Sequence, residues 1–199
     1  MAVAEPLPMS ADAFLAWIVG ESERWELVDG VPLRMMAGAK RSHNVVASNI
    51  LVALAPAAKR RGCRTTASDT AVRTGPVNVR FPDVVVDCGP PDPAAREAAS
   101  PTLVVEVASP GTSVVDLTDK LDEYRRHEAI RLILLVEPDV VAAKLYRRDA
   151  AGGWTMERHD DPAARIALPE IGAELALGDV YDTLEPGRRW RVVGDEGAG

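Results

Sequence analysis

Two valine-rich segments, residues 81–87 and 103–108, stand out from the mixed pattern of hydrophobic and polar positions along the chain. They are apolar almost without alternation and are bounded by Pro and Gly, which is typical of central strands buried on both faces. Asp83 nevertheless stands at the start of the first segment and Glu106 within the second. Because an uncompensated buried carboxylate is costly, each needs a partner. A shared cation is one solution, and a solvated strand end or an arginine partner is the other.

The pattern before these segments predicts a helix, a hairpin and a second helix. Ser10 is a suitable cap for a short helix with apolar residues at three-to-four-residue spacing, ended by Gly20. Asp29-Gly30 between two apolar runs predicts a β-hairpin. The next helix opens near Ser42; Pro56 is expected to kink or end it, and Gly62 is a natural stop. Residues 63–73 and 79–87 then form an antiparallel pair of strands across a Gly-Pro turn.

The pattern after them predicts a helix over residues 114–128 and then three strands. The helix directs Leu117, Leu121 and Tyr124 toward the core, and the strands cover residues 130–136, 140–147 and 154–158. Residues 168–181 are expected to form a capping segment. The whole pattern predicts an α/β fold with a mixed central sheet flanked by helices.

Length and composition favour one soluble domain. The chain has 199 residues, of which 47% are hydrophobic, and we expect a single domain over residues 1–185 and a polar tail over 186–199. No apolar run approaches the roughly 20 residues of a membrane span, and the start of the chain lacks a signal-peptide pattern, so we expect a cytoplasmic protein without membrane contact. Cys63 and Cys88 lack metal-ligand spacing, and we expect them to be reduced and structural.

The charge distribution is uneven. The net charge is −7, which argues against indiscriminate nucleic-acid binding by the whole surface. Residues 31–80, however, contain nine Lys and Arg against one Asp. A basic face of this kind suits a phosphate-bearing partner, whereas a cluster such as Lys59-Arg60-Arg61 also complements the dipole of its own helix.

Asp83, Glu106 and Lys120 together match the needs of metal-assisted phosphodiester hydrolysis. Carboxylate oxygens suit Mg²⁺ and leave coordination positions for water and a phosphate oxygen. A lysine ammonium adds to the stabilisation of the phosphate charge. A surface ion pair between Asp116 and Lys120, four residues apart on the helix, is the alternative interpretation.

Glu26 and His43 are secondary candidates. Glu26 lies between Trp25 and Leu27 in the first predicted strand, where a solvated glutamate is the simpler interpretation. His43 lies in the first turn of a helix, whose dipole disfavours a protonated imidazole. A neutral histidine there is able to accept a proton or bind a metal, although a first-turn histidine is commonly a surface residue.

At these residues the chain resembles the PD-(D/E)XK nuclease superfamily, and within it the Uma-two family of restriction-endonuclease-like proteins. The resemblance covers about residues 10–182. It rests on Trp25 to Gly30, Ser42-His43, Phe81 to Val86, Val105 to Pro110, and Asp116, Lys120 and Tyr124 at four-residue spacing.

The resemblance implies a restriction-endonuclease-like fold, with Asp83 and Glu106 as metal ligands and with Glu26 and His43 at further motif positions. It also implies Asp116 and Tyr124 as secondary site residues. The superfamily lysine is expected two residues after the glutamate, where this chain has Ala108. In this branch Lys120 on the following helix is expected to supply the ammonium group.

Two hypotheses follow. The first is an endonuclease that hydrolyses DNA phosphodiester bonds with Mg²⁺, or with Mn²⁺ in its place. Under this hypothesis the protein is expected to act as a homodimer. The second is a catalytically idle domain of the same fold that binds nucleic acid or a protein partner. Ala108 favours the second, and the retention of Asp83, Glu106 and Lys120 together favours the first.

Overall fold

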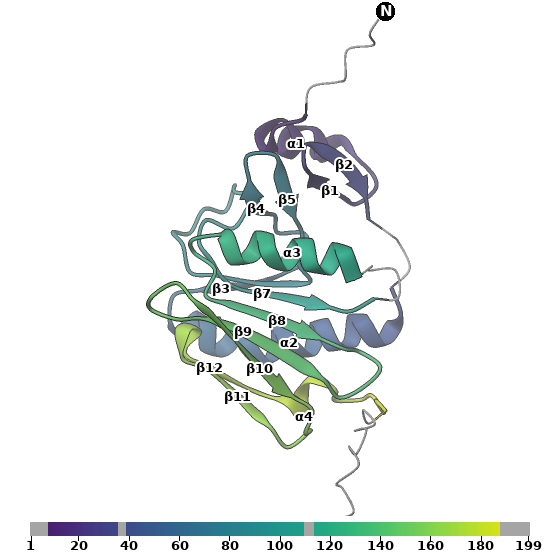
Figure 1. Cartoon of the computed structure of the whole chain (residues 1–199), viewed down its shortest axis with the longest axis vertical. Coiled ribbons are helices and arrows are strands. Elements are labelled where there is room, and N and C mark those ends of the chain that lie inside the picture. Colours follow the sequence, from purple (N-terminus) through teal and green to yellow (C-terminus); the bar gives the residue numbers. More distant parts are fainter. Residues whose placement is uncertain (1–7, 36–38, 110–113, 188–199) are drawn as a thin grey trace, which may run out of the picture.

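A six-stranded mixed sheet forms the centre of the structure (Figure 1). The computed structural model describes residues 8–35, 39–109 and 114–187. The strand order is β10-β9-β8-β7-β6-β3, and β7 and β8 are parallel while the other neighbours are antiparallel. These strands are β3 (Arg64–Ala67), β6 (Val84–Asp87), β7 (Pro101–Val107), β8 (Leu132–Val136), β9 (Ala143–Arg148) and β10 (Trp154–His159). The predicted α/β class is confirmed.

Helices cover both faces of this sheet. Helix α2 (Arg41–Arg60) packs Val46, Ile50 and Leu54 against one face, which includes Val84 and Val105. Helix α3 (Val114–Arg126) packs Tyr124 against the other, and we call this side the α3 face. Successive strand residues point to opposite faces, so a strand buried on both sides must be apolar at every position. This is why β6 and β7 are rich in valine without alternation.

A second, four-stranded sheet lies beyond the edge of α3 and is covered by the N-terminal helix (Figure 1). Its order is β2-β1-β5-β4. The elements are α1 (Ala11–Trp17), η1 (Ile18–Gly20), β1 (Trp25–Val28), β2 (Val31–Arg34), β4 (Val72–Gly75) and β5 (Asn78–Arg80). The side chain of Ser10 accepts a hydrogen bond from the backbone of Ala13, as predicted for a cap. The predicted hairpin turn is also present, with positive φ at Asp29 (48°) and Gly30 (79°).

Helix α2 does not end at Pro56, which was one of two alternatives, but continues to Arg60, and the stop predicted at Gly62 is confirmed by its positive φ of 78°. Ala57 and Ala58, which follow Pro56, are buried. The predicted capping segment contains a hairpin, which the short apolar runs did not reveal. It consists of β11 (Arg165–Leu168) and β12 (Ala173–Ala176), joined through η2 (Pro169–Ile171) and followed by α4 (Leu177–Val180). Residues 188–199 of the expected tail lie outside the described residues.

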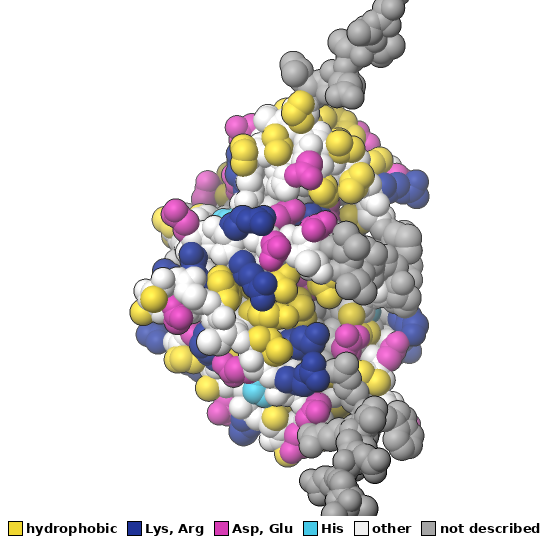
Figure 2. Space-filling view, viewed as in Figure 1, with side chains coloured by type: hydrophobic (Ala, Val, Ile, Leu, Met, Phe, Trp, Pro, Cys, Tyr) yellow, Lys and Arg dark blue, Asp and Glu magenta, His cyan; other side chains and the backbone are white. Residues whose placement is uncertain are grey.

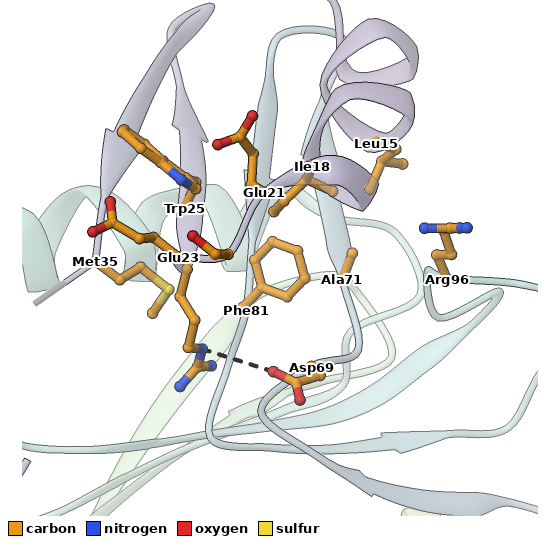
Figure 3. A pocket seen from close by; sticks show the side chains of 12 residues that line it. Leu15, Ile18, Glu21, Glu23, Trp25, Met35, Asp69, Ala71, Phe81 and Arg96 are labelled. Atoms are coloured by element: carbon orange, nitrogen blue, oxygen red, sulfur yellow. Dashed lines mark ion pairs between the residues drawn. The ribbon is translucent and has the colours of Figure 1, made fainter. Parts of the chain in front are cut away.

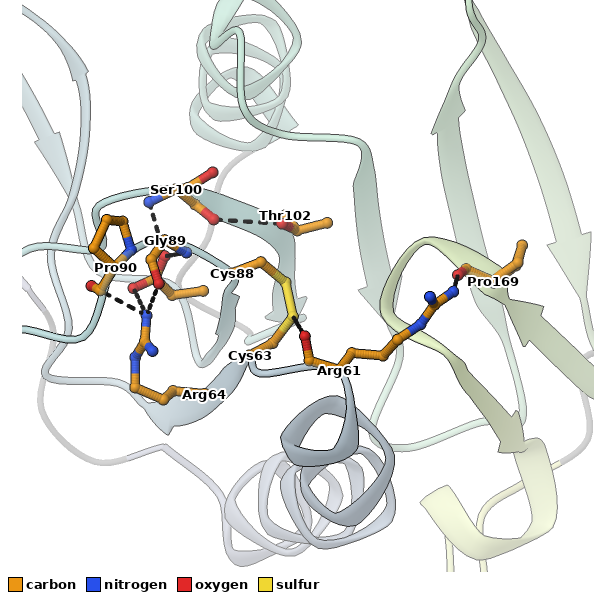
Figure 4. Close-up of a disulfide and its surroundings, with 10 residues drawn as sticks. Arg61, Cys63, Arg64, Cys88, Gly89, Pro90, Ser100, Thr102 and Pro169 are labelled. Atoms are coloured by element: carbon orange, nitrogen blue, oxygen red, sulfur yellow. Dashed lines mark hydrogen bonds and ion pairs between the residues drawn. A yellow bond between two sulfur atoms is a disulfide. The ribbon is translucent and has the colours of Figure 1, made fainter.

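The cysteines are bonded to each other, so the expectation of reduced thiols was wrong. Cys63 and Cys88 form a disulfide beside the paired ends of β3 and β6 (Figure 4). The β3–β6 register pairs Arg64 with Asp87, and one further residue along each strand brings the cysteines opposite each other. Strand register, which the spacing of 25 residues does not reveal, places them in contact.

Opening this disulfide is expected to lower the stability of the fold. The bond closes a loop of 25 residues, which in the chain-entropy model stabilises the folded state by about 3 kcal/mol. The double variant Cys63→Ala/Cys88→Ala should therefore show a smaller free energy of unfolding in urea than the oxidised wild type. Wild-type protein treated with a thiol reductant is the control and should approach the variant; equal stability of all three would contradict the prediction.

Candidate active site

The carboxylates of Asp83 and Glu106 are cross-strand neighbours. Strand β6 pairs with β7 through Val84 and Val105, and extending that register by one residue brings Asp83 opposite Glu106. Such residues share one face of the sheet, which here is the α3 face. The backbone N–H of Val107 donates a 2.8 Å hydrogen bond to Oδ2 of Asp83 and holds this carboxylate against β7. Two acids that are 23 positions apart in the chain therefore meet at one place.

Glu106 lies in a largely desolvated position. The hydroxyl of Tyr124 donates a 2.7 Å hydrogen bond to its Oε1, and the Nζ atom of Lys120 is 3.9 Å from the same oxygen. Burial raises the pKa of Glu106 to about 7; Lys120 opposes this shift, while the negative charges of Asp83 and Glu26 add to it. The structure thus has an excess of negative charge around Glu106, which a bound cation would relieve.

Lys120 links Glu106 to Glu26. Its Nζ atom lies 3.0 Å from Oε1 of Glu26 in β1, and the backbone N–H of Phe81 donates to that same oxygen over 3.2 Å. Glu26 is buried rather than the solvated strand residue of the simpler interpretation. Ala108 holds no ammonium group, and Lys120 reaches the vicinity of Glu106 from α3 instead.

His43 approaches Asp83 from the start of α2. Its Nε2 atom is 3.4 Å from Oδ2 of Asp83, and only 12% of its side chain is exposed. The hydrogen bond to Asp83 raises the pKa of His43, against the opposing effect of burial. The pKa of His43 is thus raised by Asp83, not lowered as the helix dipole alone would predict.

A buried ion pair between Arg80 and Glu123, which was not predicted from the sequence, contacts Glu26 and holds it in place. Arg80 is 1% exposed, and it donates hydrogen bonds of 2.9 and 2.6 Å to the two oxygens of Glu123 and one of 3.1 Å to Glu26. Glu123 also accepts hydrogen bonds from Thr74 and Asn78. Each residue adjoins a family motif, Arg80 before Phe81 and Glu123 before Tyr124, but no pattern in the sequence links one to the other.

Most of the predicted basic face is used for internal pairing. Within the described residues, five of its nine cations are paired with acids: Arg34 with Glu23, Lys40 with Asp139, Arg64 with Asp87, Arg73 with Glu97, and the buried Arg80 with Glu123. The positive segment of residues 31–80 therefore does not present one free cationic surface. The predicted ion pair between Asp116 and Lys120 stays a prediction, because the side chain of Asp116 lies outside the part of the chain that the structure describes.

The donor set offers a divalent cation two neighbouring carboxylates, those of Asp83 and Glu106. When all are ionised, Asp83, Glu106, Glu26 and Glu123 carry two more charges than Lys120 and Arg80 balance, and a protonated His43 beside Asp83 offsets part of this excess. A bound cation would relieve the rest. Over the described residues, no group of three or more His, Cys, Asp or Glu is arranged to hold a metal ion. Asp83 and Glu106 would thus supply two ligands, and water, backbone or substrate oxygens would complete the coordination.

The raised pKa of Glu106 predicts a pH-dependent difference from Glu106→Gln. The folded protein favours the neutral form of Glu106. The stability that this form adds to the fold is therefore present below about pH 4.5 and is lost as the pH rises through about 7. Between about pH 4.5 and pH 7, the free energy of unfolding of the wild type should therefore fall by on the order of 3 kcal/mol relative to that of Glu106→Gln. This figure follows because one pKa unit corresponds to about 1.4 kcal/mol. Urea unfolding in chelator at pH 5 and pH 8 measures this difference; a difference that does not change with pH would contradict it.

A pocket of about 290 Å³ lies next to this site but is distinct from it (Figure 3). Phe81 separates the two, because its ring lines the pocket while its backbone N–H binds Glu26. Trp25 and Met35 also line it, and Arg24 pairs with Asp69 at its margin over 3.7 Å. None of the predicted site residues lines this pocket, so it is not part of the candidate active site.

The fold and the paired carboxylates define a restriction-endonuclease-like protein. The structure superposes on the crystal structure of a protein from Anabaena variabilis, described as a "putative nuclease belonging to DUF820", with a TM-score of 0.71 and 20% identity, over 87% of this chain and 97% of the other. The sequence matches the Uma-two family (Uma2), described as "Putative restriction endonuclease", over residues 11–178, and the chain belongs to this family. It is also 28% identical over 182 residues to an uncharacterized protein of Synechocystis sp., covering 90% of this chain and 95% of that one. The resemblance noted from the sequence is confirmed.

Proposed function

We propose that this protein is a Mg²⁺-dependent endonuclease that hydrolyses DNA phosphodiester bonds, with Mn²⁺ able to replace Mg²⁺. The observation that carries the proposal is the meeting of Asp83 and Glu106 on one face of the sheet with the ammonium group of Lys120 3.9 Å from Glu106. Membership of a family described as "Putative restriction endonuclease" supports a nuclease, and the carboxylates and lysine of the site support this chemistry.

Asp83 and Glu106 would hold the metal ion. When bound, Mg²⁺ lowers the pKa of a coordinated water and stabilises negative charge on the phosphate. The Val107 N–H orients Asp83, and the Tyr124 hydroxyl orients Glu106, so that both carboxylates keep their positions without the ion. This arrangement reduces the conformational cost of binding.

Lys120 and His43 have separate roles in the proposal. Lys120 places a positive charge beside Glu106 and is itself held by Glu26, which suits it to stabilise the phosphate as charge develops. His43 lies against Asp83 with only a small part of its surface exposed, where its imidazole is able to take or return a proton during attack by water on phosphorus. Hydrolysis forms a bond from phosphorus to the water oxygen and breaks the bond to the leaving deoxyribose oxygen, which receives a proton.

The proposal is tested with purified protein and supercoiled plasmid DNA. With Mg²⁺ or Mn²⁺ the DNA should be nicked or linearised, and with a chelator it should stay intact. Calorimetry should detect binding of a divalent ion by the protein alone. Absence of both ion binding and cleavage would support the idle-domain alternative and overturn the proposal.

A further inference from the structure

One row of side chains runs across the sheet from the candidate active site. Glu106 in β7 pairs with Leu135 in β8, Leu135 pairs with Lys144 in β9, and Lys144 pairs with Arg158 in β10. Neighbouring strands are about 4.8 Å apart, so Lys144 and Arg158 follow Glu106 at roughly 10 and 14 Å. The row thus begins at the carboxylates and ends in two cations.

These cations lie on the same side of the sheet as α3. Leu135, Tyr146 and Trp154 pack against the core cluster of Tyr124, and residues two or four positions away in a strand point to the same face. Lys144 and Arg158 are therefore on the α3 face of β9 and β10. Six residues of β9 and β10 point to this side of the sheet, and we call them the outer α3 face: Lys144, Tyr146, Arg148, Trp154, Met156 and Arg158.

The outer α3 face is positively charged and partly exposed to solvent, with Met156 and Arg158 exposed and the other four residues half-buried. It contains three cations and no acidic residue, whereas Glu137 and Asp160 follow the ends of β8 and β10. Arg158 is exposed and Lys144 half-buried, and in the described part of the chain neither has an ion-pair partner. Figure 2 shows Lys and Arg side chains beside a hydrophobic strip below α3 on this side.

Two further features suit this surface to a polymer with both charged and apolar parts. Met156 is 49% exposed in the middle of β10, where it lies opposite Tyr146 and two residues before Arg158 on the same face. The guanidinium of Arg148 lies 5.9 Å from the ring centre of Trp154, and that of Arg125 in α3 lies 4.7 Å from the ring centre of Tyr146. These cation–π contacts hold two arginine guanidinium groups at this surface, where their positive charge adds to that of Lys144 and Arg158.

We propose that the outer α3 face binds the sugar–phosphate backbone of duplex DNA where it leaves the candidate active site. Lys144 and Arg158 contact phosphates, and Met156, beside Arg158 on β10, contacts a neighbouring sugar. At about 3.4 Å of helix axis per nucleotide of one strand, these contacts fall three to four nucleotides from the bond to be cut. The proposal rests on the proposed function for the choice of DNA, but the binding step needs no metal ion.

The test compares two matched pairs of substitutions in the full-length protein. Lys144→Gln/Arg158→Gln removes the two cations of the row, and Lys59→Gln/Arg60→Gln removes two exposed cations at the end of α2, on the opposite face. Binding of a fluorescein-labelled 30-base-pair DNA is measured by anisotropy in chelator at several salt concentrations, and thermal melting checks the fold of each variant.

Loss of Lys144 and Arg158 should weaken DNA binding at least 10-fold at 0.1 M salt. It should also reduce the slope of log K against log salt by about 2, roughly one for each phosphate contact. The control pair should bind within 2-fold of wild type. Three results would each overturn the proposal. The Lys144→Gln/Arg158→Gln variant, called the row variant, binds DNA as tightly as wild type; the control pair weakens binding as much as the row variant does; or wild type binds an RNA duplex more tightly than the DNA.

The outcomes also separate this proposal from the proposed function. Binding that depends on Lys144 and Arg158, in a protein that neither binds Mg²⁺ nor cuts plasmid, would support the surface and overturn the endonuclease. Metal-dependent cleavage by the wild type, together with unchanged DNA affinity in the row variant, would support the endonuclease and overturn the proposed DNA-binding surface.

Discussion

Replacing Asp83 with alanine is expected to lower metal-dependent DNA cleavage by roughly 10³-fold or more. Asp83 is one of two carboxylates that meet on the α3 face, so its removal halves the charge available to a divalent ion. Loss of one group that stabilises developing charge commonly costs 10² to 10³ in rate, and loss of a metal ligand acts on the ion itself. Calorimetry should show at least 10-fold weaker Mg²⁺ binding.

The controls for Asp83→Ala separate loss of chemistry from loss of fold. The variant gives up the hydrogen bond from the Val107 N–H, so thermal melting and circular dichroism should accompany the kinetics. Asp83→Asn keeps an oxygen acceptor for that N–H and should still lose cleavage, because it removes the negative charge. Cleavage at the wild-type rate in either folded variant would eliminate the assignment.

Replacing Arg80 with methionine is expected to destabilise the fold by about 3 to 5 kcal/mol. Arg80 is 1% exposed and donates to both oxygens of Glu123 and to Glu26, so its removal leaves uncompensated carboxylates in a desolvated place. Breaking a buried pair by deleting one partner has this order of cost. Urea unfolding at pH 7.5 measures it.

Arg73→Met is the matched control for Arg80→Met. Arg73 also bridges two carboxylates, Glu97 and Asp12, but its side chain is 33% exposed and that of Asp12 is 82% exposed. Solvent screens such a pair, and the expected loss is under about 1 kcal/mol.

The double variant Arg80→Met/Glu123→Gln tests whether the pair acts as one unit. Its loss should be smaller than the sum of the two single losses, because the second change removes the charge that the first left unpaired. Losses that add fully, or an Arg80→Met loss no greater than that of Arg73→Met, would contradict a buried pair.

Arg80 and Glu123 also illustrate where sequence reasoning ended. Arg80 is a charged residue in a strand next to a motif, and Glu123 belongs to a helix with several other acids. They are 43 positions apart, and the residues between them carry no signal that the two meet. The contact depends on how α3 lies against β4 and β5 of the four-stranded sheet, which is a property of packing rather than of spacing.

The carboxylates were accessible to sequence reasoning for the opposite reason. Asp83 and Glu106 are acids within runs whose other members must be buried, so the cost of desolvation singles them out from residue type and position in the chain alone. Lys120 was expected near them from the family resemblance, and helix periodicity predicted only that Tyr124 faces the core. The turn at Asp29-Gly30 and the Ser10 cap were predictable because each involves only near neighbours in the chain.

By itself, the sequence determined the mixed α/β class, the two doubly buried strands, the family, and the acids that must find a counter-charge. Only the tertiary structure decided which residues face one another across strands: the disulfide of Cys63 and Cys88, the Arg80–Glu123 pair, and the row from Glu106 to Arg158. The physical reason is that burial and turn formation are local consequences of residue type. Register between strands, and the crossing of a helix over them, arise from the packing of the whole chain.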